Sequence, residues 1–193
     1  MRIAVFASGN GSNFTAIADA IRDGEVKGAT LALMFTDNAS AFVLERAKEA
    51  GVPTLHLSPK DFASKADFEA ALLHELAKHS IDLIVLAGYM RIVGPTLLAA
   101  FSKKIINLHP SLLPSFPGKS GIADAYNYGM KVTGITIHYV DSGIDTGPII
   151  AQEVVEIESE DTLESLEAKI HQLEHRIYPA VIAEIIHKGD HQS

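Results

Sequence analysis

The sequence contains no cysteine and no tryptophan among its 193 residues. Without cysteine the chain can form no disulfide, no thiolate nucleophile and no cysteine-ligated zinc site. Small proteins of oxidising compartments often contain disulfides, so the lack of cysteine fits a reducing compartment. We therefore expect a cytoplasmic protein without a bound metal.

Long apolar runs and clusters of basic residues are missing as well. No apolar run approaches the ~20 residues that cross a bilayer. The opening stretch MRIAVFASGN is too short, and too soon broken by glycine, for a signal peptide. The formal net charge is −8, whereas proteins that bind nucleic acid usually present a basic face. We expect neither a membrane nor a nucleic-acid partner.

What the sequence does contain is an ordinary globular composition, with 47% hydrophobic and 21% charged residues. The length suits one α/β domain over residues 1–193. Apolar, strand-like runs at 3–7, 30–36 and 81–87 alternate with helical patterns, which predicts a mostly parallel sheet. Strands at 133–140 and 149–156 are joined by about eight residues, too few for a helical crossover. That end of the sheet should be antiparallel or bent.

The remaining elements are predicted from spacing and from proline and glycine. A helix follows the first strand, and a short edge strand covers residues 53–57. Pro179 should break or kink the last helix, and the residues after 188 should fray. Further helices are predicted over 41–50, 61–79, 95–101, 121–128 and 163–187.

The turn SGNGSN at residues 8–13 lies between a strand and a helix. Free backbone N–H groups and a positive helix end would suit an anion such as phosphate there. The turn matches neither a Walker A loop nor G-x-G-x-x-G. Ser12 or Asn13 could also simply cap the helix, so the turn alone leaves both interpretations open.

The stretch Ile105–Gly118 holds the most distinctive polar pair. Asn107 and His109 are one residue apart, just past a predicted strand end, and so point to the same side. Three prolines then stiffen the loop. This favours a preorganised polar site, although a histidine that merely ends a strand is the alternative.

Asp145 lies between glycines in DSGIDTGP. A carboxylate close to His109 would stabilise its imidazolium, and an amide could donate to a developing oxyanion. The set suits direct acyl transfer to an amine. Ser111 could be proposed as a nucleophile beside His109, but no motif supports it. His138 is interpreted as a sheet residue.

Five motifs follow one another along the chain: SGNGSNF, AGYMRIV, NLHPSLLPSFPG, DSGIDTGPIIAQ and LEHRIYP. In this order they resemble the motifs of the phosphoribosylglycinamide formyltransferases, which are folate-dependent enzymes of purine synthesis. The resemblance covers nearly the whole chain and implies a three-layer, Rossmann-like formyltransferase fold. It implies formyl transfer from 10-formyltetrahydrofolate to the amine of 5-phosphoribosylglycinamide, by a monomer or homodimer.

The resemblance also implies roles for individual residues. Asn107 and His109 would stabilise the oxyanion, with His109 as proton donor and Asp145 raising its pKa and ordering a water. Glu174 would contact the glycinamide substrate, and Lys65 the folate tail, although Lys65 alone reads as a solvated surface lysine. The phosphate would be held by Gly11, Ser12 and Asn13; the folate pocket would be lined by Met90, Arg91, Ile92 and Val93, together with Asn107.

Related activities are weighed against this one. Methionyl-tRNA formyltransferases share the Asn/His/Asp trio but usually carry Arg-Gly after SLLP, an added C-terminal domain and a basic face. A formyltetrahydrofolate hydrolase would need an additional N-terminal domain, and here the catalytic pattern begins at residue 3. A nucleotide-binding regulatory module would explain SGNGSN but gives no reason for Asn107, His109 and Asp145.

Overall fold

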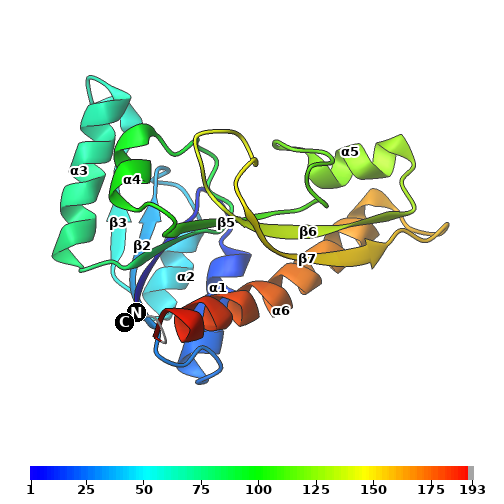
Figure 1. Cartoon of the computed structure of the whole chain (residues 1–193), viewed down its shortest axis with the longest axis horizontal. Helices are drawn as coiled ribbons and strands as arrows, with labels where there is room; N and C mark the ends of the chain where they lie inside the picture. Colours follow the sequence, from blue (N-terminus) through cyan, green and yellow to red (C-terminus); the bar gives the residue numbers. More distant parts are fainter. Residues whose placement is uncertain (191–193) are drawn as a thin grey trace.

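A mixed sheet of seven strands, in the order β3-β2-β1-β4-β5-β6-β7, runs through the molecule (Figure 1). The computed structural model describes residues 1–190. Neighbours from β3 to β5 are parallel, while β6 is antiparallel to both β5 and β7, which confirms the mixed sheet expected from the sequence. The strands are β1 (Arg2–Phe6), β2 (Thr30–Thr36), β3 (Thr54–His56), β4 (Leu83–Leu86), β5 (Ile105–His109), β6 (Val132–Tyr139) and β7 (Ile149–Glu156).

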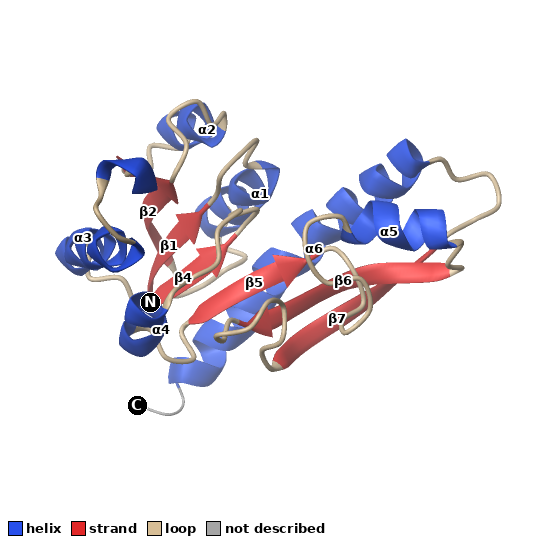
Figure 2. Ribbon diagram, turned by 90° about the horizontal axis from the view of Figure 1, so that it is seen from above, coloured by secondary structure: helices blue, strands red, loops and turns tan. Residues whose placement is uncertain are grey.

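Helices cover both faces of this sheet, which gives the three layers (Figure 2). Alternate residues of β1 divide between the two cores: Ile3 and Val5 pack under α1, α2 and α6, whereas Ala4 and Phe6 pack under α3 and α4. The helices are α1 (Ser12–Arg22), α2 (Val43–Glu49), α3 (Lys65–Lys78), α4 (Pro95–Ala100), α5 (Gly121–Tyr128) and α6 (Leu163–Asp190). Within residues 1–190 no helix has the length and hydropathy needed to cross a bilayer.

The helix predicted from residue 61 begins four residues later. The side chain of Ser64 accepts a hydrogen bond from the backbone N–H of Asp67 at 3.1 Å, so Ser64 is the N-cap of α3. Pro59–Asp61 forms a separate 3₁₀ turn before it. The start of α3 is therefore set by the capping side chain of Ser64 and not by Asp61, where the helix was predicted to begin.

Pro179 does not break α6, so that part of the prediction is wrong. The helix runs from Leu163 to Asp190 and so includes residues expected to fray; residues 191–193 lie outside the described chain. Proline inside a helix costs roughly 3 kcal/mol. Tyr178 and Ile182, both fully buried, flank it, and the Tyr178 hydroxyl donates to the carbonyl of Leu86 at 2.8 Å. Burial of this helix face outweighs the missing hydrogen bond.

Strand β5 continues to His109, so Asn107 and His109 lie within the strand, not beyond it. The extension is stabilised by pairing with β6, in which Asn107 lies opposite His138 and His109 opposite Thr136. The expectation that the two side chains share one side is unaffected, because it depends on an extended backbone.

Candidate active site

A cleft of about 530 Å³ opens at the carboxyl ends of β1, β4 and β5. Loops that follow the strands of an open α/β sheet meet at this edge. The loops that follow β1, β4 and β5 all line the cleft, together with residues of β6 and α6. The polar side chains that line the cleft include Asn10, Ser12, Asn13, Arg91, Asn107, His109, Lys119, His138, Asp141, Asp145, His171 and Glu174.

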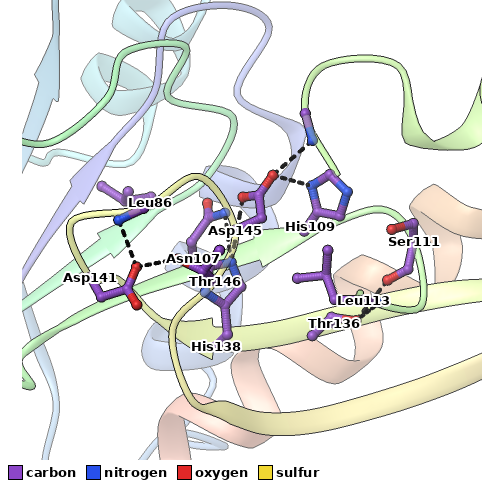
Figure 3. Close-up of polar contacts among 12 residues, drawn as sticks. Leu86, Asn107, His109, Ser111, Leu113, Thr136, His138, Asp141, Asp145 and Thr146 are labelled. Atoms are coloured by element: carbon purple, nitrogen blue, oxygen red, sulfur yellow. Dashed lines mark hydrogen bonds and ion pairs between the residues drawn. The ribbon is translucent and has the colours of Figure 1, made fainter. Parts of the chain in front are cut away.

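His109 and Asp145 meet in this cleft although 36 positions separate them in the chain. Nδ1 of His109 lies 3.5 Å from Oδ2 of Asp145, and His109 is only 4% exposed. Figure 3 shows the Asp145 carboxylate between the ring of His109 and the side chains of Asn107 and His138. The three residues selected from the sequence are therefore brought together.

The other ring nitrogen of His109 is fixed by the proline-rich loop. Nε2 lies 2.8 Å from the carbonyl oxygen of Phe116. Because a carbonyl only accepts, Nε2 must carry a hydrogen and donate it. A Cβ at Gly121 would stand 3.2 Å from this nitrogen and 3.2 Å from the same carbonyl, so only glycine leaves the contact undisturbed. Nδ1 is then the nitrogen that faces Asp145.

Asp145 is held by its own backbone and by Gly118. Its φ is +54°, a left-handed conformation that few residues other than glycine adopt and that recurs at functional sites. The N–H of Gly118 donates to Oδ2 of Asp145 at 2.9 Å. In the same loop, the Thr146 hydroxyl and then the N–H of Gly143 bind Asp141 and lower the pKa of that carboxyl. The Gly118 contact therefore fixes the direction of the Asp145 carboxylate, and the Asp141 contacts hold the loop that carries it.

His138 is one site residue that the sequence interpretation missed. The residue is 2% exposed and lines the cleft. Its Nε2 lies 3.7 Å from Oδ1 of Asp145 and 3.2 Å from Nδ2 of Asn107. The signal was the register: residues opposite one another in an antiparallel pair share a face. Aligning the two strands would have placed His138 beside Asn107.

Helix α1 begins at one end of the cleft without a side-chain cap. Its N-cap is Gly11, at φ +79°, and no side chain accepts a hydrogen bond there. Any larger residue would be strained at this φ and would place its Cβ 2.4 Å from Val43 Cγ2. The alternative that Ser12 or Asn13 caps the helix is therefore wrong. The first N–H groups of α1 remain available to an anion.

Asn13 connects this helix end to α6. Its Nδ2 donates to Oε2 of Glu174 at 3.0 Å, while its Oδ1 is buried without a partner in the described chain. Nδ1 of His171 lies 3.0 Å from the same carboxylate oxygen. This hydrogen bond is the main cause of the raised pKa of His171. His171 was not predicted, although its spacing of three from Glu174 places both on one helix face. A titratable cation thus stands beside the buried carboxylate.

The loop from Gly88 to Gly94, here the 88–94 loop, forms the opposite wall. Met90 and Ile92 are exposed there (59% and 57%), Val93 is buried, and Arg91 pairs with Asp37. These exposed apolar side chains suit a flat, aromatic ligand. Among the residues described, no group of three or more His, Asp or Glu is arranged to hold a metal.

Two residues weighed from the sequence lie outside the cleft. Lys65 is exposed and does not line it; its side chain lies close to Gly94, at the start of α4. Ser111 is fully buried and its hydroxyl donates to the carbonyl oxygens of Ser115, at 2.6 Å, and Phe116, at 3.2 Å. A hydroxyl occupied by backbone carbonyls is not placed as a nucleophile.

Known proteins share both the sequence and the fold. The Formyl transferase family matches residues 1–182. The chain is 51% identical to phosphoribosylglycinamide formyltransferase of Bacillus subtilis over 96% of this chain and 94% of that protein. Two crystal structures superpose closely on this chain. One is phosphoribosylglycinamide formyltransferase from Bacillus halodurans, with a TM-score of 0.94 and 50% identity over 98% of this chain and 97% of that chain. The other is glycinamide ribonucleotide transformylase 1 from Geobacillus kaustophilus, with a TM-score of 0.93 and 54% identity over 96% of this chain and 98% of that chain. With a family match over most of its length and relatives of this similarity, the chain belongs to the formyl transferase family.

Proposed function

We propose that this protein transfers the formyl group of 10-formyltetrahydrofolate to the amine of 5-phosphoribosylglycinamide in purine biosynthesis. The activity named for its close relatives supports this assignment. The single observation that carries it in this chain is the meeting of Asn107, His109 and Asp145 in one cleft, between an uncapped helix end and an apolar loop.

The two ends of the cleft suit the two substrates. The uncapped start of α1, with Gly11, Ser12 and Asn13, would bind the ribonucleotide phosphate through N–H groups and the helix dipole. Glu174, joined to Asn13, would contact the substrate's polar groups next to the phosphate. On the opposite wall, Met90 and Ile92 would cover the folate ring, and the backbone of the 88–94 loop would bind its polar edge. The amine and the formyl carbon would then meet near β5.

The reaction needs an oxyanion site at that meeting point. The neutral amine nitrogen attacks the formyl carbon, which becomes tetrahedral, and its oxygen takes up negative charge. The amide N–H of Asn107 and a protonated Nδ1 of His109 would donate to that oxygen. Nδ1 is the nitrogen assigned here because the Phe116 carbonyl already occupies Nε2.

Collapse of the tetrahedral species breaks its bond to N10 of the folate. The attacking amine loses one proton and N10 gains one, so the transfer is balanced without another reactant. Asp145, 3.5 Å from His109, would stabilise the imidazolium that donates and would help order a water between the two nitrogens.

Substrate dependence tests the proposal. The purified protein should produce tetrahydrofolate from 10-formyltetrahydrofolate only when phosphoribosylglycinamide is present, and should formylate that amine. Formylation of methionyl-tRNA, or release of formate with water alone, would assign the cleft to another member of the family. No turnover with either acceptor would contradict a transferase role.

A further inference from the structure

A serine hydroxyl behind the cleft connects its two walls. Ser8, at the start of the turn that leads to Gly11, accepts a hydrogen bond through Oγ from the backbone N–H of Met90 at 3.0 Å. The N–H of Ser8 also donates to the carbonyl of Gly88 at 3.1 Å. Ser8 does not line the cleft, so it would touch neither substrate.

Asp37 fixes the direction of that hydroxyl. Ser8 Oγ donates its single hydrogen to Oδ1 of Asp37 at 2.6 Å, which leaves only lone pairs to face Met90. Oδ2 of Asp37 accepts from Nε of Arg91 at 2.5 Å. The Asp37 side chain is 8% exposed, and it too does not line the cleft. One buried carboxylate thus holds two consecutive residues of the 88–94 loop, one of them through Ser8.

The other contacts of the 88–94 loop lie on either side of the segment that Ser8 and Asp37 hold. Tyr89 packs on Phe6 and Phe35 behind the loop, with ring centroids 5.5 and 5.9 Å apart. At the far end, Glu69 accepts from the N–H of Gly94 at 2.5 Å. Between these points Met90 and Ile92 project outward and are exposed. The backbone at Met90 and Arg91 is therefore held in place mainly by Ser8 and Asp37.

We propose that Asp37, acting with Ser8, is a positioning residue that holds the 88–94 loop in its folate-binding conformation. The inference rests on the proposed function, because it assigns the folate to this loop. If loss of Asp37 leaves the loop ordered about one tenth of the time, the apparent affinity for folate falls about ten-fold, since only the competent fraction binds. Affinity for the ribonucleotide, on the other wall, should change less than two-fold.

The test is a set of titration calorimetry measurements on the full chain, with tetrahydrofolate and phosphoribosylglycinamide as separate ligands. Asp37→Ala and Ser8→Ala should each weaken tetrahydrofolate binding about ten-fold, and Ser8→Thr, which restores a hydroxyl, should recover most of the loss. The double variant should lose less than the product of the two single losses, because both act on the same loop. Asp82→Ala is the matched control, because Asp82 accepts a hydrogen bond from the backbone N–H of Arg2 at 2.7 Å, at the amino-terminal ends of β1 and β4 and away from the cleft.

The outcomes separate this inference from the assignment of function. Wild-type protein that binds no tetrahydrofolate overturns the proposed function. Wild-type protein that binds both ligands, with unchanged tetrahydrofolate affinity in both variants, overturns the positioning role while the function stands. Equal losses for the two ligands, or a loss in Asp82→Ala of the same size, would mean general destabilisation and would also overturn it. If Asp37→Ala does not fold, the Ser8→Ala and Ser8→Thr pair decides alone.

Discussion

The amide of Asn107 donates a hydrogen bond to Nε2 of His138, over 3.2 Å between two neighbouring antiparallel strands. The direction follows from the other side of the ring, where Nδ1 lies 2.9 Å from the carbonyl oxygen of Tyr139. That carbonyl can only accept, so Nδ1 carries the hydrogen and Nε2 of the neutral ring must accept. His138 thereby determines which end of the Asn107 amide faces it, and leaves the second N–H of that amide for a ligand in the cleft.

His138→Phe should lower kcat roughly 10- to 100-fold, because the amide N–H of Asn107 would no longer be held in the direction of the oxyanion and would lose much of its stabilising effect. The KM values of both substrates should stay within about three-fold, since His138 contributes orientation and not affinity. His138→Gln offers Asn107 a carbonyl acceptor and should recover part of kcat. Steady-state kinetics would contradict this role if KM rose and kcat did not change.

His109→Ala should reduce kcat by on the order of 10²–10⁴, the usual range for a residue that transfers a proton in the transition state. His74→Ala, on the exposed side of α3, is the matched control and should leave turnover unchanged. Single-turnover measurements with both substrates saturating would separate chemistry from product release. Activity of the His109 variant within a few-fold of wild type would remove it from the mechanism.

Asp145→Asn keeps an oxygen for the Gly118 N–H but removes the negative charge 3.5 Å from His109 and 3.7 Å from His138. We expect kcat to fall at least ten-fold, because the imidazolium loses its counter-charge. The acidic limb of the pH–rate profile should also move. An unchanged profile with normal kcat would separate Asp145 from proton transfer. Asp124→Asn, on the exposed face of α5, is the control.

Asn13→Ala should weaken ribonucleotide binding more than folate binding. The substitution removes the Nδ2 donor to Glu174 and leaves that buried carboxylate short of a partner next to the phosphate site. An uncompensated buried group of this kind costs roughly 1–3 kcal/mol, or 5- to 150-fold in affinity. Calorimetry with each substrate gives the two ratios. A larger loss for folate would place the phosphate elsewhere.

Asp161, between β7 and α6, provides a test of stability that does not depend on function. Its carboxylate accepts from Nζ of Lys169 and Oγ of Ser165, both at 2.7 Å, and these bonds lower the pKa of Asp161 to about 2. A carboxyl whose pKa is lowered by folding stabilises the protein above its unfolded pKa of about 3.9. That stabilisation is lost as the pH falls through the folded pKa.

The Tm of Asp161→Asn should therefore lie below that of wild type at pH 7. The difference should shrink as the pH falls below about 4, where Asp161 in the unfolded chain is already protonated. Thermal unfolding followed by circular dichroism at several pH values measures it. Glu184→Gln removes an exposed ion pair with Lys188 and should change Tm little at any pH. A difference for Asp161→Asn that does not depend on pH would contradict the charged pair.

The strands of the sheet were largely predictable because burial on both faces leaves a continuous apolar run, as in residues 3–6 and 83–86. Where prediction failed, tertiary packing decided. Pro179 remains helical because its neighbours are buried against the sheet, and β5 reaches His109 because β6 pairs with it. Neither partner is adjacent in the chain, so no local pattern could have shown these contacts.

The candidate site was predictable to the extent that its residues follow strands or lie in distinctive turns. Asn107, His109 and Asp145 were found in this way, and they converge. His138 was missed because a histidine in an alternating strand has an ordinary interpretation until the register of β6 is known. The anchor made by Ser8 and Asp37 was invisible for the same reason, since three separate loops contribute to it.

The order of assembly follows from where the walls of the cleft lie in the chain. Its lining extends from Gly9 to Glu174, and α6 supplies the last of it. A partly folded chain in which α6 is not docked has no completed cleft, because His171 and Glu174 lie on that helix. Docking of α6 is therefore the folding step that completes the cleft, and ligand binding during refolding would report when that step occurs.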